Sequence, residues 1–156
     1  MKRLLIVCLG NICRSPMAEG ALRARLEAAG LGSRVQVDSA GLGNWHAGQP
    51  PDRRAIKCAA GHGVDISGLR ARQITDADYR EFDVLLCADA DVLYTVRAHA
   101  PPEATAHTEL LLDWCGLGPN AQIPDPYTLN AAAFEHAWEL VDVAAGAIVA
   151  AMKQGE

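Results

Sequence analysis

The sequence has no long basic run, no apolar stretch of membrane-spanning length and no regular cysteine pattern. Its 14 Lys and Arg residues are outnumbered by 19 Asp and Glu residues, which gives a formal net charge of −5. A nucleic-acid-binding protein would carry a basic stripe, so we expect no nucleic-acid partner. The apolar run at residues 4–7 breaks at Gly10 and Asn11, too early for a signal peptide or a membrane span. We therefore expect a cytoplasmic protein without a membrane segment.

The cysteines exclude two further classes of protein. They number five and are irregularly spaced, which argues against a secreted disulfide framework and for a reducing compartment. Cys8 and Cys13 are not followed by a second Cys/His pair of the kind that completes a zinc site, so we expect no metal. The full set of cysteines is Cys8, Cys13, Cys58, Cys87 and Cys115.

The chain is large enough for one compact domain. It has 156 residues, of which 50% are hydrophobic and 21% charged, a composition that can bury a core without disulfides and that excludes disorder. No repeat, low-complexity tract or linker interrupts it. We therefore assign residues 1–156 to a single domain.

Short apolar runs alternate with helical patterns, which predicts an α/β fold built from βαβ units. The run at residues 4–7 is typical of a parallel strand buried on both faces. Ser15 and Pro16 then predict an N-cap and the first residue of a helix that stops near Gly30. Further strands are expected at 35–37, at 84–87 and within 104–112, and further helices at 51–60, from 75–78, at 89–99 and at 131–152.

The segment 7–16, Val-Cys-Leu-Gly-Asn-Ile-Cys-Arg-Ser-Pro, lies between the first strand and the first helix. Ligands of open α/β sheets bind at this carboxyl edge, where loop amides and a helix N-terminus can surround a tetrahedral anion. Gly10 and Asn11 tolerate the unusual backbone angles of such a loop. Cys8 would be held there as a thiolate nucleophile, and Arg14 could grip two phosphate oxygens. A strand-end cysteine is, however, more often a small core residue when it is judged alone.

This segment resembles the phosphate loop of the low-molecular-weight protein tyrosine phosphatases. Pro124-Asp125-Pro126-Tyr127 is similar to the general-acid motif of that family. The shorter matches between these two motifs follow the order of the family, so the resemblance covers nearly the whole chain. They are Asp38-Ser39-Ala40, Trp45, Gly48, Pro51-Asp52, Ala71-Arg72-Gln73 and Cys87-Ala88-Asp89.

The resemblance implies a four-stranded parallel sheet with helices on both faces, and catalysis without a metal or an organic cofactor. It implies that Cys8 forms a cysteinyl-phosphate, that Arg14 binds the phosphate, and that Asp125 acts as general acid and then as general base. Ser15 would stabilise the Cys8 thiolate and Asn11 would hold the shape of the loop. The implied phosphate-binding residues are Leu9, Gly10, Asn11, Ile12, Cys13 and Ser15.

Other positions bear on the substrate. By the resemblance, Trp45 and Tyr127 are aromatic walls of the pocket, although either could serve only in packing. Relatives that act on phosphoarginine carry threonine at the position of Ile12, so isoleucine favours phosphotyrosine. Cys13 either forms a protective disulfide with Cys8, as is thought for relatives with two loop cysteines, or simply faces the core.

The chain departs from the pattern of the family at three positions. Leu69 replaces a histidine that bonds the loop asparagine in many relatives, which leaves Asn11 to find another partner or none. Val92 replaces a frequent asparagine, and Thr128 replaces a second aromatic residue at the rim of the pocket. The histidines are expected to be surface or core residues, because none has a spacing that pairs it with Cys8. They are His46, His62, His99, His107 and His136.

Two alternatives share the fold. An arsenate reductase would need two further cysteines close together, but Cys87 has no neighbour within twenty residues. A non-catalytic phosphate-binding module would have little reason to keep Cys8, Arg14 and Asp125. The expected partner is a phosphotyrosine protein, with a bacterial tyrosine kinase as a candidate, and the chain is expected to act as a monomer.

Overall fold

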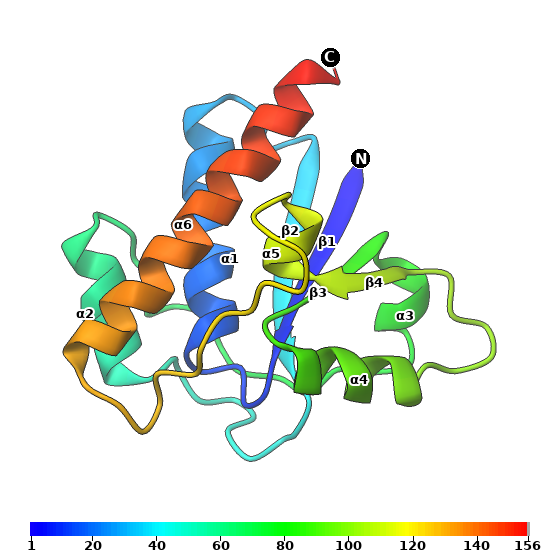
Figure 1. Ribbon diagram of the computed structural model, residues 1–156, viewed down its shortest axis with the longest axis horizontal. Coiled ribbons are helices and arrows are strands. Elements are labelled where there is room, and N and C mark those ends of the chain that lie inside the picture. Colours follow the sequence, from blue (N-terminus) through cyan, green and yellow to red (C-terminus); the bar gives the residue numbers. More distant parts are fainter. Residues whose placement is uncertain (156) are drawn as a thin grey trace.

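A computed structural model describes residues 1–155, and within them four strands form one parallel sheet in the order β2-β1-β3-β4 (Figure 1). The strands are β1 (Lys2–Cys8), β2 (Val35–Gly41), β3 (Val84–Cys87) and β4 (His107–Leu110). The chain leaves β1 toward β2 on one side and later returns to β3 on the other. Ligands of such sheets bind at this switch point, outside the carboxyl ends of the strands.

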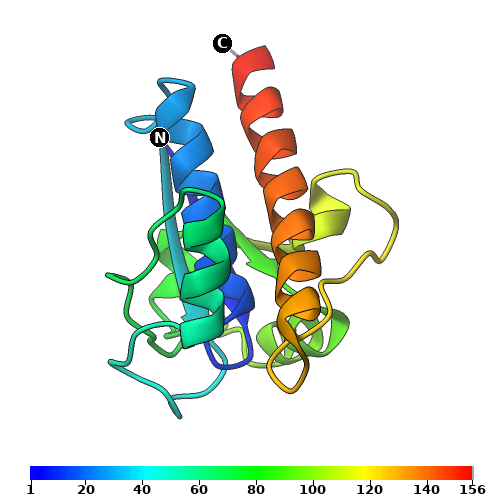
Figure 2. The ribbon, with the colours of Figure 1, turned by 90° about the vertical axis from the view of Figure 1, so that its left-hand side faces the viewer.

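Helices cover both faces of the sheet (Figures 1 and 2). One face carries α1, α2 and α6 over the larger hydrophobic core, with α5 joining it, and the other carries α3 and α4 over a smaller one. This is the predicted fold class. The helices are α1 (Arg14–Ala28), α2 (Arg53–Gly61), α3 (Asp78–Glu81), α4 (Ala90–Ala98), α5 (Leu111–Trp114) and α6 (Ala131–Gln154).

Strand β1 lies at the centre of both cores. Successive side chains of a strand point to opposite faces, so Leu4 and Ile6 enter the larger core while Leu5 and Val7 enter the smaller one. All four side chains are at most 1% exposed. This two-sided burial explains why residues 4–7 are continuously apolar.

The structure corrects several predicted boundaries. Helix α1 begins at Arg14, so the N-cap position falls to Cys13 and the prediction of Ser15 as N-cap was wrong. Ser15 lies inside the first turn, where its hydroxyl is bonded to Cys8 and Asn11 instead of capping the helix. Strand β2 continues four residues beyond the predicted 35–37, and the short helix α5 was not predicted.

Within residues 1–155, no helix combines the length and the apolar character needed to cross a membrane.

Glycine at position 20 of α1 is required by close packing. A Cβ added there would lie inside the contact distance of Ile66 Cγ2 and 3.1 Å from Val64 Cγ1, and Ile66 is fully buried. We expect Gly20→Ala to destabilise the protein, because overpacking costs about 1–3 kcal/mol and exceeds the gain of about 1 kcal/mol in helix propensity.

Gly146 of α6 provides the matched control, since its added Cβ would meet only the flexible Arg25 side chain at 3.4 Å. Gly146→Ala should stabilise the protein by about 0.5–1 kcal/mol. Thermal unfolding of both variants measures the contrast. Equal stabilisation by both substitutions would show that the contact between α1 and the 64–66 segment can relax.

Candidate active site

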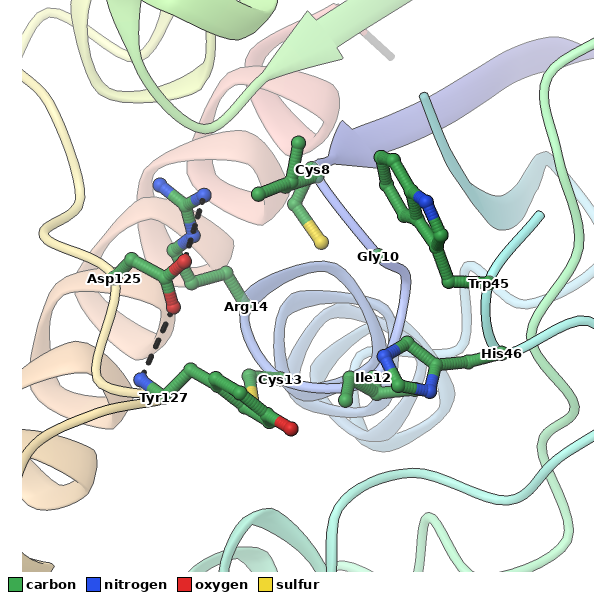
Figure 3. Close-up of a pocket in the computed structure, with 10 residues that line it drawn as sticks. Cys8, Gly10, Ile12, Cys13, Arg14, Trp45, His46, Asp125 and Tyr127 are labelled. Atoms are coloured by element: carbon green, nitrogen blue, oxygen red, sulfur yellow. Dashed lines mark hydrogen bonds and ion pairs between the residues drawn. The ribbon is translucent and has the colours of Figure 1, made fainter. Parts of the chain in front are cut away.

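Cys8 ends strand β1, and the loop that follows turns back into α1 at the carboxyl edge of the sheet (Figure 3). The Cys8 Sγ lies 2.9 Å from Ser15 Oγ, and Cys8 is 3% exposed. The first N–H groups of α1 have no acceptor within the helix and add positive potential at the loop. The structure therefore places the sulfur where an anion would be stabilised.

Asn11 holds the loop in its turn. Its φ of 59° lies in the left-handed region, which asparagine tolerates better than most residues. Its amide nitrogen donates to Ser15 Oγ at 2.7 Å and to Ser39 Oγ at 3.0 Å, and its Oδ1 accepts the N–H of Arg72 at 3.0 Å. Asn11 thus has partners although Leu69 replaces the histidine, and the Leu69 side chain packs against the larger core.

The network continues behind the loop. Ser39 donates its hydroxyl to Glu19 Oε1 at 2.6 Å, and Glu19 pairs with Arg23 at 2.8 Å. Burial raises the pKa of Glu19 even though these two partners act in the opposite direction. Gly41 of β2 lies directly against the backbone of the loop. A Cβ added there would stand only 3.0 Å from backbone atoms of Leu9, Gly10 and Asn11, so the close approach requires glycine.

Arg14 is buried with its guanidinium fixed from the side of β3. Its Nη1 donates to Asp89 Oδ2 at 2.6 Å and to the carbonyl of Ile123 at 2.9 Å, and its side chain is 3% exposed. Burial alone would lower the pKa of Arg14, but the Asp89 hydrogen bond and the charges of Cys8, Asp89 and Asp125 outweigh it, so the pKa is raised. Arg14 is therefore charged and already oriented.

Asp89 contacts Arg14 directly, although the sequence indicated it only as one of the matches to the family. Asp89 comes shortly after the carboxyl end of β3, at the edge of the sheet where ligands bind. That position in the sequence is a signal that could have indicated a place in the site. The second oxygen of Asp89 accepts the N–H of Val92 at 2.8 Å and caps α4. Val92 itself is buried in the smaller core, so its substitution lies behind Asp89 and not in the pocket.

Asp125 and Tyr127 come from the loop between α5 and α6 and face the loop of Cys8 (Figure 3). The Asp125 Oδ1 accepts the N–H of Tyr127 at 3.1 Å, and its Oδ2 lies 3.7 Å from Arg14 Nη2. The Asp125 side chain is 40% exposed, which leaves it open to solvent and substrate. Thr128 is exposed beside Tyr127.

These groups surround a pocket of about 110 Å³ (Figure 3). Trp45 and Tyr127 are exposed on opposite sides of it, as expected for two walls. His46 is a partly exposed residue that also lines the pocket, a position that only its place next to Trp45 in the sequence could have indicated. The lining residues are Cys8, Leu9, Gly10, Ile12, Cys13, Arg14, Trp45, His46, Asp125 and Tyr127.

Arg54 of α2 anchors the wall that Tyr127 forms, and sequence reasoning missed it. Its Nη2 donates to the carbonyl of Tyr127 at 2.8 Å, and its guanidinium carbon lies 5.6 Å from the centre of the Tyr127 ring. Arg54 is itself oriented by Asp52, the N-cap of α2, at 3.0 Å. The loop of Asp125 is thereby fastened to α2.

Cys13 lines the pocket as a buried thiol. Burial, followed by the negative charges of Asp52, Cys8 and Asp125, raises its pKa far above the usual value of a thiol. Cys13 is therefore a neutral thiol near neutral pH. The five cysteines of the chain, all within the described residues, carry free thiols.

The arrangement combines a cysteine sulfur, a fixed guanidinium, loop amides and an exposed carboxylate around one small pocket. This set suits phosphoryl transfer, in which positioning and charge stabilisation provide most of the catalysis. A model of the family "Low molecular weight phosphotyrosine protein phosphatase" matches residues 3–156. The chain belongs to this family.

Individual relatives agree with this assignment. The low molecular weight protein-tyrosine-phosphatase of Streptomyces coelicolor is 40% identical over 155 residues, which cover 97% of this chain and 94% of the relative. The structure of YfkJ from Bacillus subtilis, a low molecular weight protein-tyrosine-phosphatase, is 35% identical with a TM-score of 0.89, covering 100% of this chain and 97% of that one. The predicted family, enzyme class and fold are confirmed.

Structural likeness within the family extends beyond proteins named for tyrosine. The structure of a Drosophila arginine phosphatase is 30% identical to this chain with a TM-score of 0.88, and the alignment covers 98% of both chains. The fold therefore does not decide between the two phosphorylated residues, and the choice depends on the lining of the pocket.

The Asp89 contact can be tested by Asp89→Asn, which keeps a residue able to cap α4 but removes the negative charge beside Arg14. Hydrogen bonds to charged groups contribute about 1.5–3 kcal/mol, so we expect kcat/KM to fall by about tenfold or more. Phosphatase kinetics and the inhibition constant of inorganic phosphate measure the effect, with circular dichroism as the control for folding. Unchanged kinetics would mean that the Ile123 carbonyl alone positions Arg14.

Proposed function

We propose that this pocket hydrolyses phosphotyrosine in proteins through a phosphate ester of Cys8. The observation that carries the proposal is the convergence of Cys8 and Arg14, from one loop, with Asp125, from a distant part of the chain, on one pocket between two aromatic side chains. In the first step the Cys8 thiolate attacks phosphorus, and the bond to the tyrosine oxygen breaks. Asp125 donates its proton to that oxygen, so that neutral tyrosine leaves.

In the second step water hydrolyses the cysteinyl-phosphate. The Asp125 carboxylate takes a proton from this water, whose oxygen attacks phosphorus while the Cys8 sulfur leaves as a thiolate. Ser15, 2.9 Å from that sulfur, stabilises the thiolate by a hydrogen bond. Arg14 and the loop amides of residues 9–13 hold the phosphoryl oxygens throughout both steps, where charge stabilisation is most effective. The products are tyrosine and inorganic phosphate.

The pocket lining supports an aromatic substrate. Trp45 and Tyr127 lie on opposite sides of the pocket, and Ile12 adds an apolar side chain to its lining beside His46 (Figure 3). A charged guanidinium of phosphoarginine would gain less from this apolar contact than a phenol ring. This favours phosphotyrosine over phosphoarginine.

The thiols of this chain support hydrolysis over the reduction of arsenate. A relay of oxidation would need further reactive cysteines beside Cys8. Burial raises the pKa of Cys87 to about 12 and that of Cys115 to about 12, and Cys13 is still less acidic. Thiols of this kind are poor nucleophiles near neutral pH.

We propose further that the enzyme acts in the cytoplasm as a monomer and that its substrates include a tyrosine kinase of the same cell. The free cysteine thiols suit a reducing compartment. The pocket is assembled within one chain, so catalysis needs no second copy.

We expect Cys8→Ser to abolish phosphate release from a phosphotyrosine peptide, because serine is not ionised at neutral pH. Binding of inorganic phosphate should largely survive, since Arg14 and the loop remain. Metal-free assays with phosphotyrosine and phosphoarginine substrates, on both proteins, measure the reaction and its specificity. Substantial activity of the variant would exclude the mechanism, and preferential turnover of phosphoarginine would exclude the substrate class.

The role of Asp125 predicts a dependence on the leaving group. Asp125→Ala should slow aryl phosphates with basic leaving oxygens by about 10²–10⁴-fold, the usual contribution of general acid catalysis. Substrates with acidic phenols need little protonation and should be slowed much less. A plot of log kcat/KM against leaving-group pKa for both proteins measures this, because kcat/KM excludes the later hydrolysis of the cysteinyl-phosphate, in which Asp125 acts as a base for every substrate. Equal slowing across the series would contradict the acid role.

A further inference from the structure

A second cluster of chemically active side chains lies where α2 packs against α6, outside the pocket described above. Cys58 and His62 are four residues apart and therefore share one side of the helix end. Glu135, in the early part of α6, meets both of them. Its Oε1 accepts from Cys58 Sγ at 3.3 Å, and its Oε2 lies 2.7 Å from His62 Nε2.

The three potential ligand atoms are close enough to share one ion. The sulfur, the imidazole nitrogen and a carboxylate oxygen all lie within 4.8 Å of one another. Zinc bonds of about 2.0–2.3 Å in a tetrahedron place neighbouring ligand atoms roughly 3.3–3.7 Å apart. The observed separations reach this range with small rotations of the side chains.

The cluster is held in place and is accessible to an ion. The His62 ring stacks on Trp138 with centroids 5.1 Å apart and an interplanar angle of 12°, which fixes its orientation. Cys58 is 8% exposed, whereas His62 and Glu135 have side chains 39% and 49% exposed. An ion can therefore approach from solvent past His62 and Glu135, while the buried Cys58 sulfur lies on the inner side of the cluster.

We propose that Cys58, His62 and Glu135 form a binding site for one Zn²⁺ ion, with water as the fourth ligand. Sulfur, imidazole nitrogen and carboxylate oxygen are the ligand types that Zn²⁺ takes in proteins. Cys58 releases its proton to solvent on binding, and the thiolate and carboxylate together neutralise the two positive charges. Zinc here fastens α2 to α6.

The spacing of residues in the sequence could not predict this site. Cys58 and His62 supply only two ligands, and the third comes from a residue 73 positions beyond His62. The hydrogen bonds among the three side chains explain their proximity without a metal, so the test must measure coordination itself and not proximity.

Spectroscopy with Co²⁺ provides that measurement. The background is Cys8→Ser, which removes the other thiolate candidate, and the variants added to it are Cys58→Ser, His62→Gln and Glu135→Gln. We expect one Co²⁺ per chain with the near-ultraviolet absorption of a thiolate–cobalt bond. This band should vanish in Cys58→Ser, and competition by Zn²⁺ should be weakened at least about tenfold in the other two variants.

The chain offers a matched control. The exposed His107 and the half-buried Glu109 of β4 form a pair at 2.9 Å, so His107→Gln removes a similar His–Glu contact that, within residues 1–155, belongs to no group of three potential metal ligands. Its Co²⁺ spectrum should equal that of the background protein. Circular dichroism checks folding, and the exposed His62 provides an independent variant if Cys58→Ser is unstable.

Stability gives a second readout. Zn²⁺ at about a hundredfold excess over its dissociation constant should raise Tm by about 5–10 °C, and His62→Gln should abolish the rise. A thiolate–cobalt band that persists in Cys58→Ser, or that is absent from the background protein, would overturn the proposal. Its failure would leave the proposed hydrolysis untouched, because none of the three side chains lines the catalytic pocket.

Discussion

The left-handed turn at Asn11 is the constraint on which the active site depends. It reverses the loop so that Cys8, at the end of a strand, and Arg14, at the start of a helix, face the same pocket. The Asn11 amide is fixed on three sides by Ser15, Ser39 and the backbone of Arg72. These hydrogen bonds hold the loop in the shape that an anion site requires, which lowers the cost of ordering it on binding.

The parallel sheet brings the remaining groups to this loop. Because all strands run in one direction, β1 delivers Cys8, β2 delivers Gly41 and β3 delivers Asp89 to the same edge. Gly41 allows the loop to approach β2, while the carboxylate of Asp89 orients the buried guanidinium of Arg14 and helps to raise its pKa. The same sheet therefore packs a hydrophobic core against each face of β1 and brings the polar groups of the site together at the carboxyl end of β1.

The pattern of apolar and polar residues predicted those elements whose structure is determined by neighbouring residues in the sequence. The strand at 84–87 was predicted to the residue, because Asp83 directly before it and Asp89 shortly after it bound one continuous apolar run. Strand β2 was underestimated because its second half, residues 38–41, is small and polar, and only pairing with β1 makes it a strand. Ser15 was wrongly predicted as an N-cap, because its hydroxyl instead contacts the Cys8 sulfur, and this contact forms only when the loop folds back on itself. The contacts of Asp89 and Arg54 join residues more than seventy positions apart and leave no signal in spacing.

The attachment of Arg54 to the loop of Asp125 has a consequence for the pace of turnover. Through the carbonyls of Tyr127 and Leu129 and the face of the Tyr127 ring, Arg54 holds this loop against α2. In the mechanism proposed above, the acid is then already in position, and turnover needs no flap to close over the substrate or to open for the products. The rate of that mechanism would be set by chemistry at phosphorus and by the fit between the phosphoprotein and the rim of the pocket.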